Sequence, residues 1–264
     1  MTLLEAVVLA VLQGFTEFLP ISSSGHLILV PTLMGWDDQG LAFDIAVHFG
    51  TLISVIVYFR SDLAAMLRSL GNAARGTVDA DARLALQLCA ASVPIGIAGW
   101  LFVDFIEAQL RTPVVIAVTT GVFGIALWLS DRYGRRRVEE RNFGWAAALF
   151  VGMAQVLALI PGTSRSGITM TAALAAGMTR EAAGRFAFLL AIPAICMAAG
   201  WQALQLLGTN EPLPWAALIL GTAVAAAVAF ATIAVFLKLI GRIGMVWFAV
   251  YRLALAAVLL WVVG

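Results

Sequence analysis

The chain has 264 residues, of which 62% are apolar and only 12% are charged, and its formal net charge is +1. Because an ordinary soluble domain has roughly a quarter of its residues charged, this composition excludes a soluble protein. It predicts one integral membrane domain over residues 1–264, without a nucleic-acid partner.

The first apolar region, residues 3–34, is broken near its middle by the stretch EFLPISSSGHLI at residues 17–28. A second region, residues 143–178, is broken in the same way by LIPGTSRSGITM at residues 159–170. Irregular backbone at membrane depth is tolerated only when it is buried in protein or lines a wet cavity. Each region therefore predicts a re-entrant hairpin of two short helices.

Six other runs have close to the 20 apolar residues that a transmembrane helix needs. They cover residues 42–60, 84–103, 113–130, 186–207, 215–239 and 245–263. The predicted fold class is therefore an all-α polytopic membrane protein with about six transmembrane helices plus two re-entrant hairpins.

The loops between these runs differ in charge, which predicts their orientation. Arginines gather in the loops after the first and third spans, at Arg60, Arg68, Arg75, Arg83, Arg132, Arg135, Arg136, Arg137 and Arg141. The segments 104–113 and 208–214 are acidic or nearly free of basic residues. By the positive-inside rule, the arginine-rich loops are cytoplasmic, and both termini lie outside.

The two broken regions share a pattern at an offset of 142 residues. Gln13, Ser22, Ser24 and Gly25 recur as Gln155, Ser164, Ser166 and Gly167. Because each copy is followed by three spans, an odd number, the second copy is predicted to be upside down relative to the first. The chain would then form two inverted repeats, about residues 1–131 and 143–264, whose hairpin tips meet near the midplane.

The first hairpin carries an acid within a membrane segment. Glu17 follows Gln13 by four residues, so both project from one helical face. A carboxylate at this depth is costly unless it is paired, hydrated or protonated, which indicates a functional group. The alternative is a carboxylate at the outer interface.

The second hairpin carries a base. Arg165 costs about 2.5–3.5 kcal/mol on insertion scales, and its serine and glycine neighbours expose N–H groups that can form an anion-binding nest. A phosphate-sized anion would satisfy these donors. The alternative is a salt bridge to Glu17 that merely locks the hairpins together.

Several hydroxyl and imidazole groups accompany these charges. Ser22, Ser23 and Ser24 fit a helix N-cap or a nucleophile, and His26 is a candidate base or nucleophile. For Asp44, His48, Tyr251 and Arg252 we expect supporting or anchoring roles, with Arg252 paired or snorkelling. Cys89 and Cys196 fit small core residues rather than a disulfide.

The motifs QGFTEFLPISSSGH and PGTSRSG, together with FDIAVHFGT, RFAFLLAIPA and FAVYR, closely resemble the undecaprenyl-diphosphate phosphatase family, also called the bacitracin-resistance family. The resemblance covers nearly the whole chain. It implies a multi-pass enzyme of the bacterial cytoplasmic membrane that removes the terminal phosphate of undecaprenyl diphosphate, with a site open to the outer face. It also implies a divalent cation, Mg2+ or Ca2+.

Carried over by position, the resemblance makes Glu17 the essential glutamate and a metal ligand, and Gln13 replaces a residue that is glutamate in many members. Catalytic roles fall to Glu17, Ser23, His26 and Arg165. Substrate-binding roles fall to Gln13, Ser22, Ser24, Gly25, Ser164, Arg165, Ser166 and Gly167. Whether Ser23 or His26 is the nucleophile stays open, as does a homodimer.

The partners expected are a polyprenyl diphosphate and membrane lipid. A lipid-phosphate transporter or flippase is the main alternative, since carriers also use inverted repeats with broken helices. A non-catalytic lipid-binding protein is a second alternative.

Overall fold

The computed structural model describes residues 1–37, 39–206 and 213–263. These residues form helices joined by short loops, with one isolated β-bridge between Val138 and Met178 and no strand in the described ranges. In chain order the helices are α1 (Leu3–Thr16), α2 (Ser23–Met34), α3 (Leu41–Tyr58), α4 (Arg60–Ala73), α5 (Ala80–Phe105), the π-helix η1 (Ile106–Leu110), α6 (Pro113–Tyr133), the 3-10 helix η2 (Glu140–Asn142), α7 (Trp145–Gln155), the 3-10 helix η3 (Val156–Leu159), α8 (Arg165–Ala175), α9 (Arg180–Leu206), α10 (Trp215–Ile243) and α11 (Val246–Val263).

Both predicted breaks are present as non-helical turns between short helices. The first separates α1 from α2 around Pro20, and the second separates η3 from α8 around Pro161 and Gly162. Proline cannot donate the N–H that a continuing helix needs, and Gly162 has a φ of 88° that favours glycine. The sequence therefore predicted the interruption of both apolar regions correctly.

The six predicted spans are all helices. Within the described ranges, five of them are long and apolar enough to cross a membrane, namely α3, α5, α6, α9 and α10. The sixth, α11, is also apolar and has 18 residues, the same length as α3. Its start is set by Gly244, whose φ of 68° ends α10 and turns the chain.

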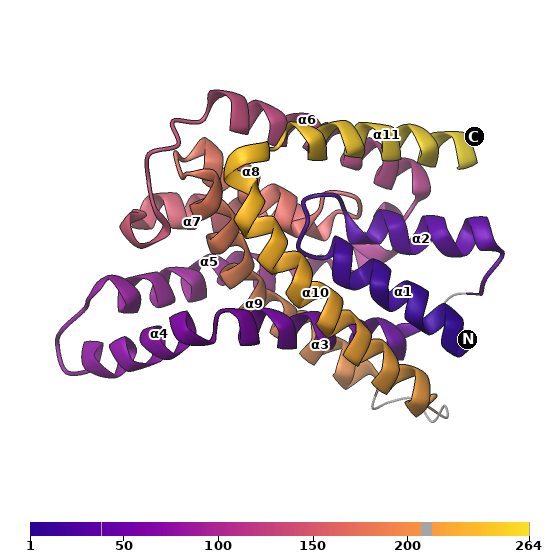
Figure 1. The fold of residues 1–264 in the computed structure, drawn as a ribbon, viewed down its shortest axis with the longest axis horizontal. Coiled ribbons are helices and arrows are strands. Elements are labelled where there is room, and N and C mark those ends of the chain that lie inside the picture. Colours follow the sequence, from indigo (N-terminus) through magenta and orange to yellow (C-terminus); the bar gives the residue numbers. More distant parts are fainter. Residues whose placement is uncertain (38, 207–212, 264) are drawn as a thin grey trace.

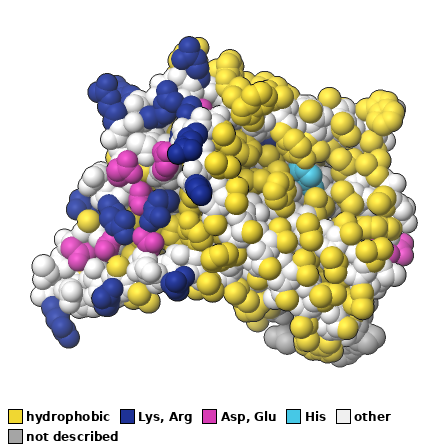
Figure 2. Space-filling model, viewed as in Figure 1, with side chains coloured by type: hydrophobic (Ala, Val, Ile, Leu, Met, Phe, Trp, Pro, Cys, Tyr) yellow, Lys and Arg dark blue, Asp and Glu magenta, His cyan; other side chains and the backbone are white. Residues whose placement is uncertain are grey.

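Helix α4 was not predicted, because its arginines indicated a loop. It forms an amphipathic helix whose buried residues include Met66 and Ser69, and it packs against α5. In Figure 1 this pair of helices extends from one end of the molecule. Figure 2 shows that Lys, Arg, Asp and Glu side chains gather at that same end, whereas hydrophobic side chains cover most of the remaining visible face.

Ion pairs join the loops at this charged end. Arg141 donates to Asp62 at 3.0 Å and to Asp81 at 2.6 Å, while Arg185 donates to Asp62 and to Glu140, both at 2.7 Å. The hydrogen bond to Asp81 is the main reason that the pKa of Arg141 is raised. Arg141, which was predicted to mark the cytoplasmic side, thus also joins α4 to α5, and Arg185 attaches α9 to the same end.

Helix packing pairs the two halves of the chain. α1 lies on α10 and α7 lies on α5, while α3 packs against α9 and α6 against α11. Figure 1 shows α6 and α11 side by side, with the α1–α2 hairpin toward one end and α7 toward the other. These pairings fit the predicted repeat, in which α1, α3, α5 and α6 correspond to α7, α9, α10 and α11. The inverted orientation itself stays a prediction.

Two smaller expectations have different outcomes. Cys89 and Cys196 are exposed rather than core residues, so that interpretation was wrong. The acidic loop predicted at 208–214 falls mostly outside the described residues, since 207–212 are not among them.

Candidate active site

The turns before α2 and α8 have the same backbone shape. Ser22 and Ser164, the residues that precede the two helices, have φ values of 74° and 69°, a region that residues other than glycine seldom adopt. In each turn the serine hydroxyl lies 3.2 Å from the hydroxyl of the serine two residues later, Ser24 or Ser166. The repeated motif therefore specifies a repeated turn, and such strained turns concentrate at functional sites.

The two turns are joined directly to each other. The Gly162 N–H donates to the Ser24 hydroxyl at 3.2 Å, and the Ser166 hydroxyl donates to the Leu19 carbonyl at 3.0 Å. Residues 148 positions apart in the chain, Glu17 and Arg165, form a salt bridge of 2.7 Å between Oε1 and Nη2. The predicted meeting of the hairpin tips is thus present.

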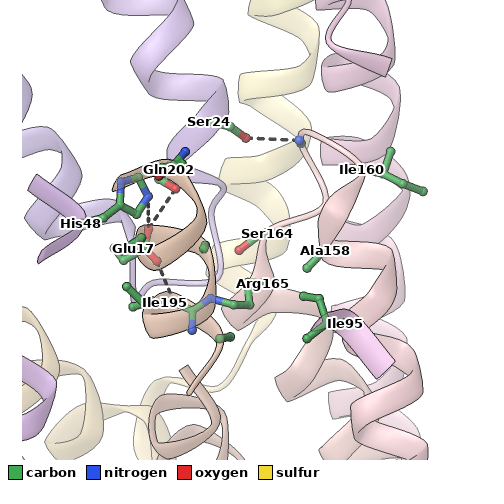
Figure 3. Close-up of a pocket in the computed structure, with 15 residues that line it drawn as sticks. Glu17, Ser24, His48, Ile95, Ala158, Ile160, Ser164, Arg165, Ile195 and Gln202 are labelled. Atoms are coloured by element: carbon green, nitrogen blue, oxygen red, sulfur yellow. Dashed lines mark hydrogen bonds and ion pairs between the residues drawn. The ribbon is translucent and has the colours of Figure 1, made fainter. Parts of the chain in front are cut away.

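A cavity of about 260 Å³ lies beside this junction (Figure 3). One wall is polar and comes from both hairpins and from α3. The other wall is formed mainly by small and branched apolar residues of α5, the second hairpin and α9. The lining residues are Glu17, Ser23, Ser24, His48, Ile95, Ala158, Ile160, Gly162, Ser164, Arg165, Ala194, Ile195, Ala198, Ala199 and Gln202.

Glu17 is the centre of the polar wall. Its Oε2 accepts from Gln13 Nε2 at 2.9 Å and from the Ser23 hydroxyl at 3.3 Å, while its Oε1 accepts from Arg165. The side chain is only 8% exposed. Glu17 is therefore a buried, multiply hydrogen-bonded carboxylate inside the protein, not a group at the lipid interface.

Arg165 reaches Glu17 from the first turn of α8. Its Nη1 is buried without a hydrogen-bond partner in the described part of the chain, as are Gln13 Oε1 and both amide atoms of Gln155. A buried donor without a partner is energetically costly. The guanidinium therefore retains donor capacity beyond its bond to Glu17.

His26, predicted as a base or nucleophile, is not among the cavity-lining residues. Its Nδ1 lies 2.7 Å from the Ser22 carbonyl, and its Nε2 lies 2.5 Å from the Tyr251 hydroxyl. The two rings are parallel, with centroids 5.6 Å apart. Since both ring nitrogens are engaged, His26 orients the start of α2 against α11 in this structure.

Arg252 occupies the space behind both turns. It is fully buried, and its hydrogen bonds within the described ranges all go to main-chain carbonyls, those of Thr120 at 2.9 Å, Gly162 at 3.0 Å, Thr163 at 2.9 Å, Pro20 at 3.3 Å and Thr119 at 3.5 Å. It therefore does not snorkel, and no acid among the described residues pairs with it. The sequence indicated only that this residue needs partners, and the partners are main-chain carbonyls of α6 and of both hairpins.

The model of the family BacA, described as bacitracin resistance protein BacA, matches residues 6–258. The chain belongs to this family. The family predicted from the motifs is thereby confirmed.

Curated relatives of this BacA family member match over nearly their whole length. "Undecaprenyl-diphosphatase 2" of Stutzerimonas stutzeri is 51% identical over 98% of this chain and 98% of its own. "Undecaprenyl-diphosphatase" of Nitrosococcus oceani is 51% identical over 98% of both chains, and that of Alteromonas mediterranea is 49% identical over 100% and 99%.

Two residues that line the cavity of this family member were not predicted from the sequence to be part of the site. His48 lies on α3, and its Nε2 is 3.8 Å from Glu17 Oε2. The sequence had indicated only a supporting or anchoring role for this residue. Gln202 of α9 was not singled out at all. Figure 3 shows both residues beside Glu17. The i, i+4 spacing of Asp44 and His48 was the only available signal.

The resemblance implies a divalent cation, and the residues at the cavity show which side chains could bind it. In the described ranges no group of three or more His, Cys, Asp and Glu side chains could hold a metal. Mg2+ is commonly held by one or two carboxylates together with substrate phosphates. Glu17, whose carboxylate lines the cavity, fits a cation that is shared with a phosphorylated substrate.

Proposed function

We propose that this chain is an undecaprenyl-diphosphatase, an integral membrane enzyme that hydrolyses undecaprenyl diphosphate to undecaprenyl phosphate and phosphate. The full-length relatives carry that name at about 50% identity. The observation that carries the mechanism is the junction of Glu17, Ser23 and Arg165 on one wall of a cavity.

The cavity suits a diphosphate because several positive groups face it. The N-terminal ends of α2 and α8 both lie at the cavity, at Ser23 and Arg165. A helix N-terminus presents unpaired N–H groups and the positive end of the helix dipole to an anion. Arg165 adds a planar guanidinium that binds phosphate oxygens in pairs. Together these donors neutralise a diphosphate away from bulk water.

The attacking group in this mechanism is Ser23. Its hydroxyl lies 3.3 Å from Glu17 Oε2, and the Glu17 carboxylate accepts the proton as a bond forms between Ser23 Oγ and the terminal phosphorus. The bond from that phosphorus to the bridging oxygen breaks, and this oxygen leaves with undecaprenyl phosphate. Water then hydrolyses the phosphoserine and releases phosphate. His26, bonded to Ser22 and Tyr251, keeps the first turn in place.

Mg2+ or Ca2+, held by Glu17 and the diphosphate oxygens, would supply positive charge that stabilises the transferring phosphoryl group. Ser164, Ser166 and Gly167 shape the turn that presents Arg165, and Ser22, Ser24 and Gly25 shape its counterpart. The polyprenyl chain contacts the apolar wall and surrounding lipid, where burial contributes with little dependence on chain length.

The enzyme belongs, on this proposal, in the cytoplasmic membrane of a bacterium, with the site open to the outer face. The charged end formed by α4 and its neighbours then faces the cytoplasm, as the positive-inside rule requires. Two single-cysteine variants, one with the cysteine at the charged end and one with it at the opposite end of the molecule, would test the orientation. An impermeant maleimide should label only the cysteine outside the membrane in intact cells.

Phosphate release by the purified protein tests the activity. Farnesyl diphosphate or undecaprenyl diphosphate with Mg2+ should yield inorganic phosphate, and Ser23→Ala should abolish the release while binding persists. A carrier or a lipid-binding protein would bind substrate without releasing phosphate, and that result would refute the proposal. Release that survives Ser23→Ala but not His26→Ala would assign the attack to histidine instead.

A further inference from the structure

We propose that His48 is a nitrogen ligand of the divalent cation at this site, acting together with Glu17. This inference rests on the proposed function, because it concerns the cation of the same reaction. It makes the site a mixed nitrogen and oxygen site, and it gives a role to an imidazole that the proposed phosphoryl transfer does not use.

The hydrogen bond of His48 Nδ1 determines which nitrogen of the imidazole can bind a metal. His48 Nδ1 lies 2.8 Å from the Asp44 main-chain carbonyl. A carbonyl oxygen can only accept, so Nδ1 must carry the hydrogen. In the neutral ring the lone pair is then on Nε2. A backbone carbonyl that holds the second ring nitrogen in this way is the usual support of a metal-bound histidine.

The free nitrogen faces another electron-pair donor. His48 Nε2 lies 3.8 Å from Glu17 Oε2 (Figure 3), which is beyond hydrogen-bond distance. Both side chains line the cavity, and the His48 side chain is about one-third exposed. When the imidazole is neutral, both atoms are electron-pair donors, and a positive ion between them would stabilise both. Bonds of about 2.1 Å to each atom span the gap without a backbone movement.

The surroundings explain why the ion would need both residues. Gln13 offers an amide rather than a second carboxylate at this position, and its Nε2 donates to Glu17 Oε2. No third His, Cys, Asp or Glu joins the group in the described ranges. Substrate oxygens and water complete the coordination. Because imidazole favours transition metals whereas Ca2+ takes oxygen ligands, His48 should raise the affinity for Mn2+ and Co2+ relative to Ca2+.

Pulsed electron paramagnetic resonance of bound Mn2+ tests this ligand without measuring activity. The chain has only two histidines, so the purified protein, carrying a tag without histidine, gives a simple spectrum. The echo of Mn2+ in the wild type should show coupling to a 14N nucleus, and growth with 15N-histidine should replace it with 15N coupling. This comparison needs no mutation. It is made with and without methylenediphosphonate as a non-hydrolysable diphosphate.

The variants then assign the nitrogen to one residue. His48→Gln should remove the coupling and weaken Mn2+ binding by at least the roughly 10-fold that loss of a supporting residue around a metal ligand costs, whereas His26→Gln should keep the coupling. Bound Mn2+ without nitrogen coupling, coupling that persists in His48→Gln, or no Mn2+ binding would each overturn the proposal. Phosphate release from the same wild-type sample separates the two hypotheses, since its absence refutes the proposed function whereas its presence without coupling refutes only the role of His48.

Discussion

Replacing Arg252 by methionine should unfold the junction between the hairpins. Methionine has a similar length and fills the same space, but it cannot donate a hydrogen bond. In the structure the guanidinium joins α11 to the carbonyls of Thr120, Gly162 and Thr163, each at 3.0 Å or less. The substitution therefore removes three buried hydrogen bonds to a charged donor, although the Gly162 carbonyl also accepts from the Thr120 hydroxyl.

The size of the effect follows from those three contacts. A buried hydrogen bond to a charged group contributes about 1.5–3 kcal/mol, so the loss of three gives about 4.5–9 kcal/mol before relaxation. Water entering the wet cavity and the removal of a buried charge reduce this sum. We therefore expect about 3–5 kcal/mol.

Thermal unfolding in detergent measures the loss. At about 2–4 °C per kcal/mol for a chain of this size, the apparent midpoint of Arg252→Met should fall by roughly 6–20 °C. Its rate of phosphate release well below the midpoint should fall about 100-fold, because the hairpins shift relative to each other. Arg83→Met, an exposed arginine, is the matched control. A midpoint within about 2 °C of the wild type with normal turnover would refute the reasoning.

Four further substitutions test the site and the packing. Arg165→Lys should lower turnover about 100- to 1,000-fold with little change in the unfolding midpoint, because a point charge cannot replace the planar fork; near-normal phosphate release would contradict this. Gln13→Glu replaces the donor to Glu17 by a second carboxylate. It should therefore tighten Mn2+ binding and lower the unfolding midpoint in the absence of a cation. An unchanged Mn2+ affinity would contradict the idea that a carboxylate at position 13 binds the cation together with Glu17. Gly50→Ala should cost about 1–3 kcal/mol or more, since its Cβ would lie 2.4 Å from a carbonyl of α10. Gly71→Ala, with no atom within 4 Å, should gain up to about 1 kcal/mol, and equal midpoints for these two variants would show that the helix contact is loose.

The helical pattern of the chain was predictable because membrane helices are set by hydropathy and by breaks. Proline, glycine and serine clusters marked both hairpins, and apolar length marked the spans. Helix α4 escaped because its arginines and aspartate have the composition of a cytoplasmic loop, while its buried Met66 and Ser69 become meaningful only against α5. The cysteines were misplaced for a related reason, since an apolar run does not reveal which of its faces meets lipid.

The charged residues of the site could be predicted from the sequence, but the directions in which its histidine side chains point could not. Glu17 and Arg165 stood out because an ionised group at membrane depth needs a partner, and the repeated motif brought the two tips together. The direction of the His26 side chain depends on which helix α2 contacts, and no sequence signal indicated that Tyr251 would be its partner. The same holds for His48, whose nearness to Glu17 follows from the placement of α3 beside the first hairpin.

The salt bridge between Glu17 and Arg165 gives the proposed mechanism an order of events. Without substrate, each charge satisfies the other at 2.7 Å, so neither is left unpaired in a low-dielectric region. A bound diphosphate competes for the guanidinium, because phosphate oxygens accept from it in the same geometry as the carboxylate. Once Arg165 turns toward phosphate, Glu17 loses its strongest stabilising partner and becomes a better acceptor for the proton of Ser23. Substrate binding would therefore activate the base, and Ser23 would remain inert while the site is empty.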